Sequence, residues 1–294
     1  MLTLCYTTNA KGESNMKIFM SVDMEGIAGT FNWKQETNVR NLVRKCMMDQ
    51  VSWVIEGIKE SSRNSEIDEI VIADSHDGGD SLTYDITALD DRLHLITGSP
   101  RPNYMMPDFE NGYDIVFLVG YHAGTGAHKG NMDHTYSNGC FHNIWINDIP
   151  MNESFVNSAY AGRMGVPVGL IIGDSKLREE IFGENGMPWV EYVVTKKALS
   201  KYAVKQRPQN VVKRETIEAV KKCLEKNPKD IPLYIFKKTP IELKIEFQTS
   251  SQADIVQRIP YSKRVDGRTV SYSDDDYKII FETVMAMNGL AVNG

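Results

Sequence analysis

Carboxylate and imidazole side chains recur in four short segments of this 294-residue chain. The segments are 21–26 (SVDMEG), 73–76 (ADSH), 120–122 (GYH) and 147–153 (NDIPMNE). Imidazole and carboxylate ligands together favour zinc, manganese or cobalt over magnesium or calcium. We therefore expect a transition-metal site, and such a site suits hydrolytic chemistry.

The first segment places Asp23 and Glu25 two residues apart, so in an extended strand both side chains point to the same face. Two carboxylates this close repel each other unless a cation lies between them. An isolated Asp-x-Glu pair is common in solvated turns. The pair therefore indicates a metal site only when further ligands accompany it.

His76, His122 and Glu153 supply those further ligands. A single histidine at a strand end is often only a hydrogen-bonded structural residue. Together with the acid pair they make five ligands, too many for one four-coordinate zinc that keeps an open position. Five ligands suit two metals about 3.5–4 Å apart that share a carboxylate. The residues therefore predict a dimetal hydrolase.

A catalytic group outside the ligand set is expected in the Gly-rich polar loop at 123–140. His134 in this loop could act as a general acid or stabilise a developing oxyanion. His128 and His142 compete for the role, and sequence physics alone does not rank them. Cys140 lies nearby, but no surrounding feature predicts the lowered pKa that a thiol nucleophile needs.

Buried parallel strands are expected directly before three of the four segments. Each is a short apolar run, at residues 17–20, 69–72 and 115–119. Helical spacing over 36–62 joins the first run to the second, which makes a right-handed βαβ unit. Ligands of open α/β sheets bind at the carboxyl ends of the strands, so the three strand ends should share one rim.

The rest of the chain predicts further strands and helices. They are a strand near 94–97, a hairpin over 141–150, a helix over 154–164, a strand over 166–172, and Asp174 as the cap of a helix over 175–182. Later elements are helices at 209–226, 253–258 and 274–291 and strands at 243–247 and 269–272. The fold class is α/β, a mainly parallel sheet flanked by helices with a smaller C-terminal α+β subdomain.

We divide the chain into a disordered extension, a metal-binding catalytic domain and a packing or assembly subdomain. Their ranges are 1–15, 16–187 and 188–294. An upstream choice of start codon is the other explanation for the extension. The second boundary follows a change to Lys-rich sequence near 188–208.

Composition excludes several classes of partner. The formal net charge of −6 shows no basic excess, so neither nucleic acid nor an anionic membrane surface is expected to bind. No apolar stretch approaches the roughly 20 residues of a membrane span. The four cysteines are scattered and form no CxxC pair, which predicts reduced thiols in the cytoplasm.

Six segments taken together resemble those of the DppA-type zinc D-aminopeptidases. The shared segments are SVDMEG at 21–26, DSH at 74–76, GYHA at 120–123, MDH at 132–134, ND at 147–148, and Glu153. Their order, residue types and separations match from residue 16 to about residue 175, and the resemblance is looser beyond residue 185. Six segments in order are specific, whereas any one of them alone is weak.

The resemblance implies a role for each candidate residue. By this resemblance Asp23 would bridge two zinc ions. Glu25 and His76 would bind one of these ions, and His122 and Glu153 would bind the other. His134 would be the catalytic histidine. It also implies that the substrates are short peptides with a free N-terminus and a preference for D-amino acids such as D-Ala. The family assembles as a ring-based decamer whose active sites face an inner channel.

The sequence leaves alternatives open. The loop between His122 and His134 is slightly longer than in the family and contains the additional His128, which leaves side-chain specificity open. Manganese or cobalt could replace zinc. The rival functions are a dimetal amidohydrolase or phosphoesterase and a non-catalytic metal-binding homologue. A phosphate substrate favours Arg or Lys near the site, and this loop contains only Lys129.

Overall fold

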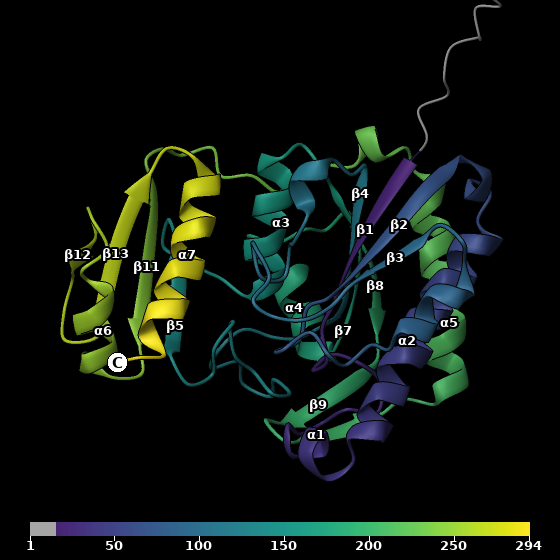
Figure 1. Cartoon of the computed structure of the whole chain (residues 1–294), viewed down its shortest axis with the longest axis horizontal. Coiled ribbons are helices and arrows are strands. Elements are labelled where there is room, and N and C mark those ends of the chain that lie inside the picture. Colours follow the sequence, from purple (N-terminus) through teal and green to yellow (C-terminus); the bar gives the residue numbers. More distant parts are fainter. Residues whose placement is uncertain (1–15) are drawn as a thin grey trace, which may run out of the picture.

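The computed structural model describes residues 16–294, so the extension expected at 1–15 lies outside the described residues. The largest element of the described chain is a six-stranded parallel sheet in the order β3-β2-β1-β4-β7-β8 (Figure 1). Its strands are β1 (Met16–Val22), β2 (Ile67–Asp74), β3 (Leu93–Ile96), β4 (Ile115–Tyr121), β7 (Val168–Gly173) and β8 (Glu191–Val194). The order reverses beside β1, because β2 lies on one side of it and β4 on the other.

Helices cover both faces of this sheet (Figure 1). The α-helices are α1 (Lys34–Asn38), α2 (Arg40–Glu60), α3 (Glu153–Arg163), α4 (Ser175–Ile181), α5 (Gln209–Glu225), α6 (Ser250–Val256) and α7 (Tyr277–Ala291). Short 3-10 helices are η1 (Asn64–Glu66), η2 (Tyr84–Leu89), η3 (Phe109–Asn111) and η4 (Pro228–Asp230). Within residues 16–294, no helix combines the length and apolarity that crossing a membrane requires.

Alternate side chains of the central strands enter two separate cores, because successive residues of a strand point to opposite faces. Ile18 and Met20 of β1 belong to the core that also contains side chains of α2 and α5. Phe19 belongs to the core on the other face, with side chains of α3 and α7. Because these strands are buried on both faces, nearly all of their residues are apolar. Short apolar runs in the sequence therefore predicted them.

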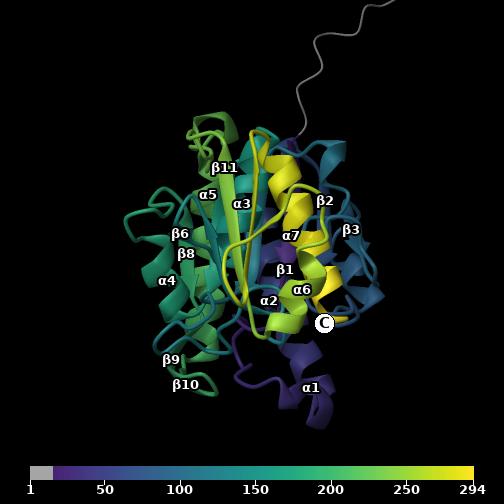
Figure 2. The same ribbon diagram turned by 90° about the vertical axis from the view of Figure 1, so that its left-hand side faces the viewer.

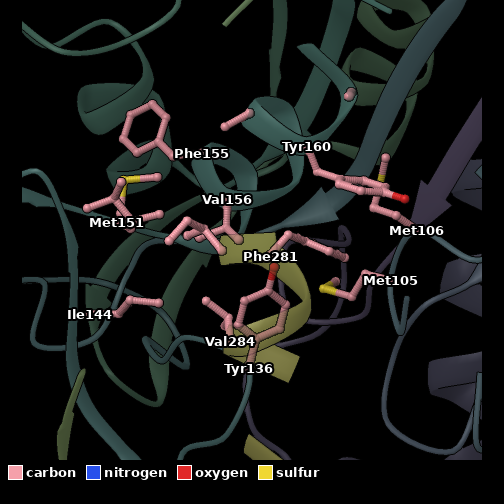
Figure 3. Close-up of a cluster of buried hydrophobic side chains, with 14 of the residues drawn as sticks. Met105, Met106, Tyr136, Ile144, Met151, Phe155, Val156, Tyr160, Phe281 and Val284 are labelled. Atoms are coloured by element: carbon pink, nitrogen blue, oxygen red, sulfur yellow. The ribbon is translucent and has the colours of Figure 1, made fainter. Parts of the chain in front are cut away.

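A second sheet is antiparallel, with the strand order β12-β13-β11-β5-β6, and its side chains contribute to the core that contains Phe19. This sheet lies on the left of Figure 1 and faces the viewer in Figure 2. Its strands are β5 (Phe141–Ile146), β6 (Ile149–Pro150), β11 (Ile241–Phe247), β12 (Lys263–Arg264) and β13 (Thr269–Asp274). Helix α7 contacts both this sheet and α3. Figure 3 shows the contact, where Phe281 of α7 stacks on Tyr160 of α3 with ring centroids 4.2 Å apart.

A small two-stranded sheet lies at the end of the molecule that also holds α1 (Figure 1). It is an antiparallel hairpin of β9 (Lys196–Ser200) and β10 (Ala203–Gln206). The sequence did not predict this hairpin, because its strands are short and rich in lysine. Its tip lies close to the loops that follow β1 and β4: the Tyr202 ring lies 5.8 Å from that of Trp33, and the Lys201 carbonyl accepts the side-chain amide of Asn131.

The α/β class and the mainly parallel sheet are confirmed. The hairpin of β5 and β6 and the cap at Asp174 are also confirmed, since the Asp174 side chain accepts the backbone N–H groups of Lys176 and Leu177. The single helix expected over 36–62 is wrong, because it is two helices, α1 and α2. Val39 separates them with φ −144° and ψ 43°, outside the helical region.

Strand pairing crosses the division expected between residues 187 and 188. β8 and α5 follow that boundary, yet β8 pairs with β7 in the parallel sheet and α5 packs on α2. β5 precedes the boundary but pairs with β11 in the antiparallel sheet. The division between the two sheets therefore does not coincide with residue 187. The division into a catalytic domain and a packing or assembly subdomain stays a prediction.

Candidate metal centre

The predicted ligands meet at the carboxyl edge of the parallel sheet. Asp23 and Glu25 follow β1, His76 follows β2, and His122 follows β4. Glu153 is the first residue of α3, the helix that packs against β4. Because the strand order reverses between β1 and β4, this is the point at which open α/β sheets bind their ligands.

Two glycines allow the segments after β1 and β4 to approach closely. The Gly26 backbone N–H donates to the carbonyl of Gly120 at 2.6 Å. A Cβ atom on Gly26 would lie 1.9 Å from the carbonyl oxygen of Tyr121, and one on Gly120 would lie 2.1 Å from that of Asp23. Gly120 also has φ +80°, a conformation that side chains disfavour. The glycines of the two motifs therefore bring acids and imidazole together.

Asp23, Glu25 and His76 form a first group of potential ligands. The Nδ1 atom of His76 lies 3.1 Å from Oδ1 of Asp23 and 3.2 Å from Oε2 of Glu25. All three side chains are buried. Their converging atoms therefore surround one position at which a cation could bind.

His122 forms a second group with Glu153, and Asp23 reaches this group as well. Its Nε2 atom lies 3.4 Å from Oε2 of Glu153 and 3.4 Å from Oδ2 of Asp23. Nδ1 of His122 lies 3.0 Å from the carbonyl oxygen of Ala123, so a proton on Nδ1 leaves the Nε2 lone pair free for a metal. Asp23 thus directs one carboxylate oxygen to each group, as a bridging ligand does.

The chemistry of these side chains fits bound cations. Asp23 Oδ2, Glu25 Oε2 and His122 Nε2 are buried atoms without a hydrogen-bond partner among residues 16–294. Burial and the adjacent Glu25 carboxylate raise the pKa of Asp23 to about 7. Such crowding of carboxylates is costly, and positive charge between them removes the cost. Carboxylate and imidazole donors suit zinc in particular.

His134 is the loop histidine that lies beside the second group, with a ring nitrogen within 4.8 Å of the ligand atoms of His122 and Glu153. Its ring stacks on that of His122, with centroids 4.3 Å apart and planes 5° apart. Nδ1 lies 3.0 Å from the carbonyl oxygen of Met132, while Nε2 faces Glu153 at 3.7 Å. Burial and the neighbouring His122 lower the pKa of His134, which favours a neutral ring. His128, which the sequence could not rank against it, is exposed.

Several residues near the predicted ones do not join the centre. The Asp74 carboxylate accepts the backbone N–H groups of Ser81 and Leu82, each at 2.7 Å, and so holds the loop after β2. Asp148 pairs with Lys244 at the β5–β6 hairpin. Cys140 is buried within the second core and does not line the pocket at the centre.

The centre opens into a cavity of about 190 Å³ whose walls include residues that the sequence analysis missed. Trp33 donates its indole N–H to Oε1 of Glu25 at 2.6 Å. Glu36 lies 3.0 Å from the outer nitrogen of His76. Both residues occur at the start of the helical stretch, where periodicity marks only the apolar face. An aromatic residue and an acidic residue shortly after the DMEG motif were the only features of the sequence that could have indicated these two residues.

A buried hydrogen-bond network beneath the centre joins the strand ends. The Tyr121 hydroxyl lies 2.7 Å from Oγ of Ser21 and accepts from the Asn157 amide at 2.9 Å. Ser21 Oγ also lies 2.7 Å from Oγ of Ser75. The side-chain oxygen of Asn157, Oδ1, accepts a hydrogen bond from the Tyr136 hydroxyl at 2.8 Å. The network therefore connects β1, the segment after β2, β4 and α3, the elements that present the ligands.

The β9–β10 hairpin holds the loops on either side of the centre. The Lys196 ammonium is buried and donates to the carbonyls of Ile27 and Thr30 at 2.9 and 2.7 Å. The Lys201 ammonium donates to the carbonyl of Asp133 at 2.6 Å, directly before His134. The C-terminal half of the chain therefore contributes to the centre as well as to packing.

Comparison with known proteins agrees with this geometry. A family model for D-aminopeptidases matches residues 16–286. The D-aminopeptidase of Bacillus subtilis (strain 168) is 29% identical over 285 residues, 94% of this chain and 98% of that protein. The solved structure of "Zn-dependent D-aminopeptidase DppA from Bacillus subtilis, a self-compartmentalizing protease" matches with a TM-score of 0.83 and 27% identity, over 95% of this chain and 99% of its own. Sequence and fold together show that the chain belongs to the D-aminopeptidase family.

Proposed function

We propose that this protein is a zinc aminopeptidase that removes an N-terminal residue, preferably a D-amino acid such as D-Ala, from short peptides. The observation that carries the proposal is the position of Asp23. One of its carboxylate oxygens lies 3.1 Å from His76 and the other 3.4 Å from His122, so a single side chain serves both ligand groups. Zinc-dependent D-aminopeptidase activity in a structural relative of the same family supports the choice of reaction.

Two zinc ions per chain are proposed for these two groups. Glu25 and His76 would complete one site, and His122 and Glu153 the other, with Asp23 between them. When bound, the ions supply Lewis acidity and make water a competent nucleophile near neutral pH. The buried residues of the centre exclude bulk water and fix the ligand positions before substrate arrives.

His134 is proposed as the catalytic histidine outside the metal ligands. Its Nδ1 is hydrogen-bonded to the carbonyl of Met132, so Nε2 is the nitrogen that points toward Glu153. From there it can hydrogen-bond the oxygen on which negative charge develops, or protonate the leaving amine. In the neutral ring the proton lies on Nδ1, which donates to the carbonyl of Met132, so Nε2 starts unprotonated. Both roles therefore require Nε2 to take up a proton during turnover.

The cavity favours a small amide substrate over a phosphoester. Its volume of about 190 Å³ suits a short peptide. The described residues that line it include the acids Glu36 and Asp77 beyond the ligands, but no Lys or Arg. A phosphate group is normally held by such cations. An acidic wall is instead compatible with the ammonium group of a free N-terminus.

We further propose that the protein is a homo-oligomer, a decamer by resemblance to the family, and that it acts in the cytoplasm. The self-compartmentalizing character of the structural relative supports oligomerisation. Cys46, Cys140 and Cys223 are free thiols, in keeping with a reducing compartment. Light scattering of the purified protein and fractionation of cells test these two proposals.

The test of function combines metal analysis with hydrolysis of matched D-Ala and L-Ala p-nitroanilides. We expect about two zinc ions per chain and faster release from the D-substrate. Chelation should abolish release, and added zinc should restore it. Two metals without release from either substrate would keep the centre but reject the aminopeptidase, in favour of another amide or a phosphoester.

A further inference from the structure

Two side chains of one short segment bond to the first ligand group from outside. Trp33 directly precedes α1 at the N-cap position, and Glu36 lies in the first turn of this helix. Trp33 bonds to Glu25 and Glu36 to His76, so two of the three residues of this group are held from α1.

Glu36 fixes the ring of His76. The imidazole is buried, and its two nitrogens face opposite partners. Nδ1 lies between Asp23 and Glu25, while Nε2 lies 3.0 Å from Oε1 of Glu36. A carboxylate that accepts the outer N–H of a ligating histidine fixes its tautomer and ring orientation and increases its basicity. Glu36 is placed to do this for His76.

Trp33 fixes the carboxylate of Glu25. Its indole N–H, which is a donor only, reaches Oε1 at 2.6 Å. Oε2 remains directed at Nδ1 of His76 and has no hydrogen-bond partner among residues 16–294. The indole therefore leaves one defined oxygen of Glu25 for a cation.

The second ligand group is held differently. Nδ1 of His122 bonds to the carbonyl of Ala123, and Oε1 of Glu153 accepts the backbone N–H of Tyr136 at 2.6 Å. These partners are backbone groups, which side-chain substitution does not remove. The ligands of the two groups thus receive their hydrogen bonds from different parts of the chain. The groups still share Asp23, and the Trp33 ring also meets the ring of His134 edge-on at 5.3 Å.

We propose that Glu36 and Trp33 are positioning residues for the metal held by Asp23, Glu25 and His76, and that α1 thereby sets the affinity of this metal separately from the other. The inference rests on the proposed two-zinc centre. Glu36 acts through His76 and Trp33 through Glu25, without themselves binding metal. Loss of either should weaken one zinc and leave the second bound.

The experiment is a zinc titration of the metal-free protein against a chromophoric chelator, without any peptide substrate. The variants are Glu36→Gln, Glu36→Ala and Trp33→Phe, each checked for folding by circular dichroism. In Glu36→Ala and Trp33→Phe we expect one of the two zinc ions to lose about 10–100-fold in affinity, while the other keeps its wild-type affinity. Glu36→Gln keeps a hydrogen-bond acceptor and should lose less than Glu36→Ala.

Asp77→Asn is the matched control. Asp77 lines the same cavity, and its carboxylate forms no hydrogen bond or ion pair with another residue of the range 16–294. The substitution removes one negative charge from the cavity, as Glu36→Gln does. If general electrostatic attraction were the cause, both variants would lose affinity equally. We expect Asp77→Asn to bind both zinc ions as the wild type does.

The outcomes separate this inference from the proposed function. Two zinc ions in the wild type with unchanged affinities in all three variants would overturn the role of α1 and leave the enzyme proposal standing. Equal weakening of both ions would also overturn it, because α1 would then act on the whole centre. Fewer than two zinc ions in the wild type would remove the two-metal centre itself, and the inference with it.

Discussion

Replacing Gly26 by alanine should disable the centre without touching a ligand. The added Cβ atom would lie 1.9 Å from the carbonyl oxygen of Tyr121 and 2.6 Å from that of Gly120. Both oxygen atoms belong to the backbone, so no side chain can rotate out of the way. Because His122 follows Tyr121 directly, the end of β4 must move away from the loop that carries Asp23 and Glu25.

The size of that movement follows from the contact distance. Real Cβ atoms essentially never approach other heavy atoms within 3.0 Å, so the gap must widen from 1.9 Å by about 1 Å. A misplacement of about 1 Å in a reacting centre can cost about 100-fold in rate. The same overpacking should cost about 1–3 kcal/mol of unfolding free energy. His122 would then no longer share Asp23 with His76.

The assay measures kcat/KM for D-Ala p-nitroanilide and the zinc content of the same preparation. We expect kcat/KM to fall at least about 100-fold and zinc binding to weaken. Gly78→Ala is the matched control, because Gly78 lies two residues after His76 in the loop after β2. A Cβ there would meet its nearest atom, Oδ1 of Asp80, only at 3.9 Å. This variant should keep the activity and zinc content of the wild type.

Full activity and full zinc content in Gly26→Ala would refute the reasoning. That result would mean that the loops after β1 and β4 can separate without disturbing the candidate ligands. The close approach of these two loops would then not be what assembles the centre. Equal losses in Gly26→Ala and Gly78→Ala would also count against it, because the effect would then follow from losing any glycine near the site.

Three other substitutions test separate parts of the argument. Asp23→Ala should release both zinc ions together, and a variant that retains one ion at full occupancy would contradict bridging. His134→Ala should keep both ions yet lose at least about 100-fold in kcat, whereas full activity would exclude its catalytic role. Arg92 holds the pKa of Asp90 down to about 2, from 3.8, so this pair should stabilise the fold above about pH 4 and cease to do so as the pH falls toward 2. Urea unfolding of Asp90→Asn should therefore show a loss of about 1–2 kcal/mol at neutral pH that shrinks in acid, and a constant difference would be inconsistent with this origin.

Strand-end placement made the convergence of the main candidate ligands predictable from sequence. Asp23, His76 and His122 each follow an apolar run, and parallel strands bring their carboxyl ends to one edge whatever the details of packing. The sequence could not choose between His134 and His128, because a Gly-rich loop has no periodicity that fixes which side chains turn inward. In the structure His134 stacks on His122, whereas His128 is exposed, and this supports the choice of His134.

The support for the centre was not predictable, because most of it uses contacts that have no local pattern. Lys196 and Lys201 lie in a Lys-rich stretch that predicts a solvated surface, yet Lys196 is buried. Their partners are backbone carbonyls of loops more than 60 residues away, and a carbonyl is present at every position of any sequence. A cation surrounded by such acceptors can be recognised only after the chain has folded. For the same reason, the Lys-rich part of the C-terminal half, which the sequence assigned to packing or assembly, can hold the loops on both sides of the candidate metal centre.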